Sequence, residues 1–141
     1  MRCISAYLWE LREVHKTIQN EPLTNEERDE IIHAYNQIVN LCRTADTSGV
    51  EIFDMQRMKL DQKNCERILC EFAEHVANNT KPGLFEEVAF SRLLTLPEPP
   101  AYEILIYLMY LRGMYLLCTE LDYISIGVQL RAMLPEEIQL K

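Results

Sequence analysis

One pair of residues in the chain has a spacing that occurs in metal sites. Glu30 and His33 lie three residues apart in the segment Glu-Ile-Ile-His. Side chains at this spacing project from the same side of a helix, and di-iron carboxylate bundles combine two such pairs with two further carboxylates. Only one Glu-x-x-His pair occurs in this chain. We therefore interpret it as part of an exposed helix face, and we predict no metal and no cofactor.

The thiols and the third histidine offer little catalytic chemistry. Cys65, Cys70 and His75 follow one another at intervals of five residues, which turns successive side chains around a helix, whereas structural zinc sites favour closer pairs. No glycine-rich phosphate loop is present, and no nucleophile and base lie together in the sequence. We predict that the protein is not an enzyme, and we keep a small helical enzyme or metal protein as the second alternative.

Charge and cysteine usage restrict the partners and the compartment. The chain has 22 acidic and 14 basic residues, so that its formal net charge is -8. This charge repels phosphate backbones, and we predict no binding to nucleic acid. The five cysteines form an odd set without a disulfide framework, which indicates a reducing compartment, the cytoplasm.

The stretch 101–121 is the most apolar part of the chain. Residues 104–111 are eight consecutive apolar or aromatic residues. The stretch is long enough to span a membrane, but it contains Glu103 and Arg112 and distributes three tyrosines along its length, whereas membrane helices concentrate tyrosine at their ends. We predict no membrane span. A helix that is apolar on almost all sides is expected at the centre of a bundle.

The remaining segments show the periodicity of amphipathic helices. A capping box, Thr24-Asn25-Glu26-Glu27, predicts a helix start, and the prolines between residues 96 and 101 predict a stiff connector. After Pro135 we expect no apolar anchor. The sequence thus predicts an all-α fold, a single helical domain over residues 1–141 with about seven helices around 101–121. The other helices are expected near 3–19, 24–45, 61–76, 84–94 and 123–134, with a short methionine-rich piece at 50–60.

Two short motifs and the order of the segments resemble the Bcl-2 family of apoptosis regulators. Residues 41–46, Leu-Cys-Arg-Thr-Ala-Asp, fit the Leu-x-x-x-small-Asp pattern of the third homology region of the family. Residues 53–60 follow where family members carry a segment with Phe and Met, and residues 79–90 are distantly similar to the helix that begins with Asn-Trp-Gly-Arg. In the family the most hydrophobic helix follows this last motif directly, whereas here 101–121 comes one segment later. The small size is most similar to viral members of the family.

The resemblance implies a compact Bcl-2-like bundle that binds a helix in a surface groove. Such proteins inhibit apoptosis by sequestering the amphipathic death-motif helices of pro-apoptotic host proteins. Lys81 would stand in for the arginine that pairs with the aspartate of the ligand. The residues that the resemblance places at this partner groove are Leu41, Ala45, Asp46, Phe53, Met55, Met58, Ile68, Phe72, Val76, Lys81, Gly83 and Phe85.

An alternative keeps the fold and changes the role. Some viral proteins of this fold lack a working groove and modulate innate immune signalling through surface or dimer contacts. Glu74, Glu86 and Glu87 place negative charge near the expected mouth of the groove and favour this alternative. A homodimer is expected if the methionine-rich segment is exposed.

Overall fold

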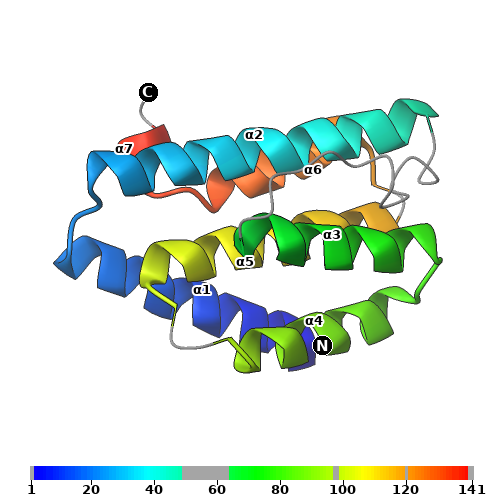
Figure 1. Ribbon diagram of the computed structural model, residues 1–141, viewed down its shortest axis with the longest axis horizontal. Helices are drawn as coiled ribbons and strands as arrows, with labels where there is room; N and C mark the ends of the chain where they lie inside the picture. The colour runs from blue at the N-terminus through cyan, green and yellow to red at the C-terminus, as the bar shows by residue number, and fades with distance from the viewer. Residues whose placement is uncertain (1, 49–63, 97–98, 120, 140–141) are drawn as a thin grey trace.

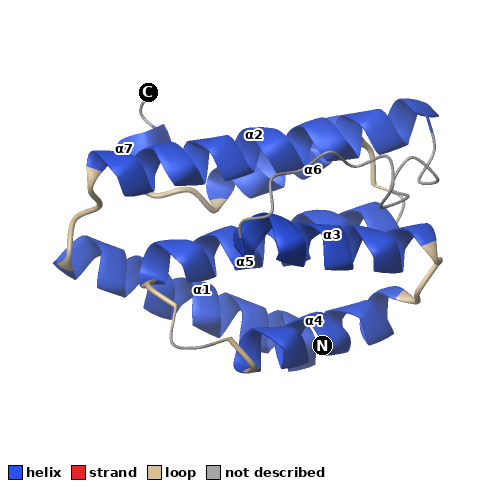
Figure 2. Ribbon diagram, in the orientation of Figure 1, coloured by secondary structure: helices blue, strands red, loops and turns tan. Residues whose placement is uncertain are grey.

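The protein is all-helical in every part that the structure describes (Figures 1 and 2). The computed structural model describes residues 2–48, 64–96, 99–119 and 121–139, and within them it describes the backbone alone for 2–9, 46–48, 64–66, 137 and 139. The all-α prediction is confirmed. The helices are α1 (Arg2–Asn20), α2 (Asn25–Ser48), α3 (Asn64–Ala77), α4 (Pro82–Leu94), α5 (Ala101–Cys118), α6 (Tyr123–Ala132) and the four-residue α7 (Glu136–Gln139).

Helix α5 lies at the centre of the bundle. It packs against α1, α2, α3, α4 and α6, and Figure 1 shows α2 and α6 above it, α1 and α4 below it and α3 in front. Residues 105–111 are buried in succession, so this part of the helix is covered on all of its sides. Among the described helices, α5 alone has the length and composition of a membrane span, and 56% of it is buried inside the bundle.

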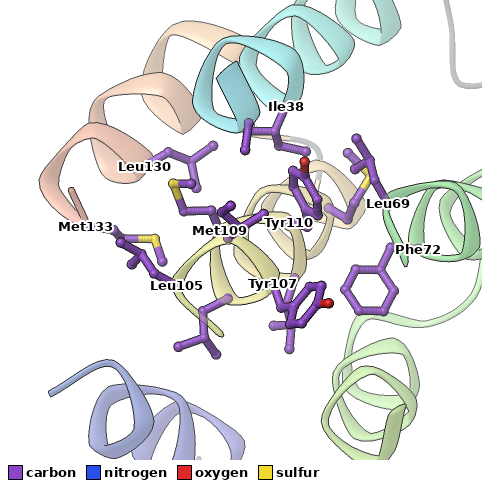
Figure 3. Close-up of a cluster of buried hydrophobic side chains, with 14 of the residues drawn as sticks. Ile38, Leu69, Phe72, Leu105, Tyr107, Met109, Tyr110, Leu130 and Met133 are labelled. Atoms are coloured by element: carbon purple, nitrogen blue, oxygen red, sulfur yellow. The ribbon is translucent and has the colours of Figure 1, made fainter. Parts of the chain in front are cut away.

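Side chains of α2, α3 and α6 illustrate how the neighbouring helices pack against α5. Figure 3 shows Ile38 of α2, Leu130 of α6 and Phe72 of α3 directed toward α5 from different sides. Ile38 and Leu130 are completely buried, and Phe72 is 2% exposed. Burial of large apolar side chains of this kind contributes about 1.5–3 kcal/mol each. The core is therefore organised as a shell around one helix.

Local signals in the sequence fix several helix ends. The capping box is confirmed: the Thr24 amide donates to Glu27 Oε1 at 2.9 Å, and the Glu27 amide donates to Thr24 Oγ1 at 3.1 Å. At the end of α3, Asn79 adopts a left-handed conformation with φ of 58°, and the Thr80 amide donates to the His75 carbonyl at 3.0 Å. Asparagine tolerates this conformation better than most residues do. Asn79 is also the first residue of the segment 79–90 in the resemblance to the Bcl-2 family. Its position at the end of α3 is enough to explain an asparagine there.

The end of α5 and the segment after α6 differ from the sequence prediction. Helix α5 ends at Cys118 rather than at residue 121, because Thr119 Oγ1 donates to the Leu116 carbonyl at 2.7 Å and closes the last turn. The sequence analysis did not predict a helix after Pro135, where the turn after α6 brings the short helix α7 back onto the bundle. Leu134 and Ile138 are buried in the core as a result.

Substitution by alanine is expected to have opposite effects on stability at Gly113 of α5 and at Gly127 of α6. A Cβ atom at Gly113 would lie 2.7 Å from Ile38 Cγ1 and 3.3 Å from Leu130 Cδ1, whereas at Gly127 the nearest atom is Val39 Cγ1 at 3.9 Å. Overpacking costs roughly 1–3 kcal/mol, and alanine gains up to about 1 kcal/mol over glycine in a helix. We expect Gly113→Ala to lower the free energy of unfolding and Gly127→Ala to raise it, as measured by urea denaturation.

A double substitution identifies the cause of the first effect. Ile38→Ala removes the atoms that the new methyl group would meet, so the combined variant Ile38→Ala/Gly113→Ala should lose less stability than the sum of the single variants. Strict additivity would show that the close approach of α2 to α5 does not account for the loss.

A second prediction concerns the paired amino-terminal halves of α2 and α5. Burial and the neighbouring carboxylate of Glu30 raise the pKa of Glu103, and a hydrogen bond with Tyr102 opposes this shift. The folded state therefore binds this proton more tightly than the unfolded state, and stability falls as pH rises from the ordinary pKa of Glu through the raised pKa. We expect Glu103→Gln to raise the melting temperature at neutral pH, with a gain that shrinks as pH falls to about 4. The control is Glu74→Gln on the exposed face of α3, and a gain from Glu103→Gln that is independent of pH would contradict the explanation.

Candidate functional site

Four of the apolar residues assigned to the partner groove lie in the core of the structure. Ile68, Phe72, Val76 and Phe85 are each at most 4% exposed. The rings of Phe72 and Phe85 meet edge to face, with centroids 5.5 Å apart and planes at 88°. These contacts join α3 to α4 over the face of α5. In this conformation a partner helix cannot touch these four side chains unless α3 or α4 moves.

The other residues assigned to the groove are spread over three locations. Ala45 is buried in α2, and Leu41 packs at the edge of the core. Lys81 and Gly83 are exposed at the start of α4, where the Lys81 carbonyl accepts a hydrogen bond from the Phe85 amide at 2.9 Å. The side chain of Asp46 and the residues Phe53, Met55 and Met58 lie outside the described part of the structure.

Two of the described thiols are poor nucleophiles. Burial raises the pKa of Cys42 to about 12 and that of Cys118 to about 11, so both remain protonated at neutral pH. Among the described residues no group of three His, Cys, Asp or Glu side chains could hold a metal ion, and both Glu30 and His33 are exposed on α2.

An apolar recess, here called the α4–α5 cleft, opens between the end of α4 and the start of α5. Its volume is about 360 Å³. Tyr107 and Leu108 of α5 form its floor and are nearly completely buried, whereas Leu94 at its rim is 87% exposed. The full lining comprises Glu10, Phe90, Leu93, Leu94, Leu96, Pro99, Ile104, Tyr107 and Leu108.

Polar contacts and prolines position the α4 side of the cleft. Arg92 Nε donates to Glu71 Oε2 of α3 at 2.8 Å, and an amino group of the same guanidinium donates to Thr95 Oγ1 at 2.9 Å. One side chain therefore connects α3 to the residue that caps α4. On the other side of the connector, Pro100 is in an extended conformation and precedes the first turn of α5. The cleft lies between these two helix ends.

The charge at the cleft comes from α1. Glu10 is the single acidic or basic residue of the lining, and no described residue makes a hydrogen bond or an ion pair with its carboxylate. A second recess of about 420 Å³ is more polar, since His15, Gln19 and Glu136 contribute to it. There His15 Nε2 lies 2.8 Å from the Met133 carbonyl oxygen and connects α1 to the turn after α6. The exposed apolar rim distinguishes the α4–α5 cleft as the candidate binding site.

The sequence analysis did not find this cleft, although one signal for it was present. Phe90, Leu93, Leu94 and Leu96 are four apolar residues within seven positions, which is more than the core-facing side of a short helix can bury. Leu94 is far from the side of α4 that carries the buried residues Phe85 and Ala89. This surplus of apolar residues could have indicated a surface that is only partly covered.

No similarity to a known protein shows which family the chain belongs to. Comparisons with models of protein families, with curated proteins and with solved structures each found no match.

Proposed function

We propose that the protein is a helix-binding regulator of the Bcl-2 type, which inhibits apoptosis by sequestering amphipathic death-motif helices of host pro-apoptotic proteins. The observation that carries the binding function is the α4–α5 cleft, an open apolar recess with an 87% exposed leucine at its rim. Surface apolar recesses of this kind bind partners or ligands.

The size of the cleft favours a few anchor side chains over an entire small molecule or domain. A cavity of about 150 Å³ accommodates one benzene ring, so about 360 Å³ has room for two or three apolar side chains. An amphipathic helix supplies such a set at positions i, i+3 or i+4, and i+7. The described part of the chain contains no strand whose edge could pair with an extended peptide.

The role in cell death comes from the resemblance of residues 41–46 and of the segment order to the Bcl-2 family. The structure supports one element of that order, a central apolar helix surrounded by the others. The helix after Asn79 is the peripheral α4, and the central helix follows it as α5. The binding surface that we propose is the α4–α5 cleft, whose lining includes none of the residues that the resemblance assigned to the groove.

Calorimetry with a panel of death-motif peptides tests the proposed function. We expect at least one peptide to bind with a dissociation constant below tens of micromolar, and we expect Leu94→Glu to weaken that binding at least tenfold because it places a charge on the apolar rim. Leu84→Glu is the matched control: Leu84 is also exposed on α4, at 54%, but it does not line the cleft.

Two results would contradict the proposal. The first is that no peptide of the panel binds. The second is that Leu84→Glu weakens binding as much as Leu94→Glu does, since the bound helix would then lie elsewhere on α4. Because both leucines are exposed, neither substitution removes a core contact, and thermal unfolding of the two variants verifies that they fold.

The alternative, a protein that acts on innate immune signalling through surface or dimer contacts, is favoured by a different observation. Ile124 and Val128 are 62% and 66% exposed and lie one turn apart on α6. If this face joins two copies, the protein sediments as a dimer, and Ile124→Glu converts it to a monomer. If the unmodified protein sediments as a monomer, the part of this alternative that depends on dimer contacts is excluded.

A further inference from the structure

An acidic group stands beside the apolar surface of the α4–α5 cleft. Glu10 projects from α1 into a lining that is otherwise made of apolar residues, proline and one tyrosine. It is partly exposed, and none of the described residues pairs with its carboxylate. A charge beside an apolar surface interacts with its counterpart more strongly than one that is fully surrounded by water.

Further carboxylates extend this acidic edge along α1 and α4. Glu13 lies three residues after Glu10 and hence on the same side of α1. Its contact with Lys16, at 3.6 Å between two well-exposed side chains, is of the weak surface kind. On α4, Glu87 is exposed and precedes Phe90 of the lining by one turn. The cleft is therefore apolar at its floor and acidic beside its rim.

From this arrangement we infer that the partner of the cleft is a cationic amphipathic helix, whose apolar residues enter the cleft and whose Lys or Arg residues, about one turn away, pair with Glu10. The inference rests on the proposed function, because it names the chemistry of the helix that the cleft binds. Complementary charge at the rim of an interface contributes to specificity and to the rate of association.

The net charge of the protein favours this partner over two others. A second copy would bring another chain with a net charge of -8 to an acidic edge, so charge repulsion opposes that contact. A membrane surface with anionic lipids would be repelled in the same way. A basic helix meets neither barrier, and its charge also increases the rate of encounter with an acidic protein.

The experiment compares two synthetic helical peptides with identical apolar residues at i, i+3 and i+7, one with Lys and the other with Glu at the flanking polar positions. We expect the Lys peptide to bind the full chain at least tenfold more tightly at about 50 mM salt, and we expect the difference to shrink at about 500 mM salt.

Charge-reversal variants separate a local contact from the overall charge. Glu10→Lys and Glu74→Lys change the net charge equally, but Glu74 is on the exposed face of α3 and does not line the cleft. We expect Glu10→Lys to weaken binding of the Lys peptide roughly tenfold and Glu10→Gln to weaken it about threefold. Glu74→Lys should change the affinity for this peptide less than about twofold.

The outcomes distinguish a failure of the proposed helix-binding function from a failure of the inference about Glu10. If neither peptide binds, the proposed helix-binding function fails. If both peptides bind equally, or if Glu10→Lys and Glu74→Lys have the same effect, the function stands and the inference about Glu10 is overturned. If the unmodified protein is a dimer that Leu94→Glu dissociates, the cleft belongs to a second copy, and the inference is likewise overturned.

Discussion

The whole structure depends on covering α5 on every side. A helix with a single apolar stripe needs one neighbour, but α5 buries seven consecutive residues, 105–111, and its neighbours must therefore surround it. Five other helices contact it. This requirement also explains why Gly113 lies in the middle of a helix: the missing side chain allows Ile38 of α2 and Leu130 of α6 to approach the backbone of α5.

The features that the sequence predicted correctly are those that local chemistry determines. The capping box at Thr24 requires only residues 24–27, and the apolar run in α5 is visible without any knowledge of its neighbours. The features that were missed depend on contacts between distant segments. Ile138 reads as an isolated apolar residue among polar ones, and it becomes an anchor because the turn at Pro135 directs α7 back onto the bundle.

The same distinction accounts for the candidate site. Periodicity identifies which side of α3 is apolar, but a side chain that lines a groove and one that fills a core have the same pattern. Phe72 and Phe85 were assigned to a groove by resemblance, and they are instead packed against each other at 5.5 Å. The α4–α5 cleft could not be predicted from any one segment, because its lining comes from α1, α4, the connector and α5.

The cleft lies where the cover of α5 is least complete. Near its amino-terminal end α5 is covered by the last turn of α4, and there Leu94 is turned outward while Phe90 and Leu93 are only partly buried. Arg92, paired with Glu71 and Thr95, connects this last turn of α4 to α3. A partner helix bound in the cleft would complete the layer of helices around α5. The burial of apolar surface that assembles the bundle would then also supply the binding energy, and Glu10 would determine which helices are accepted.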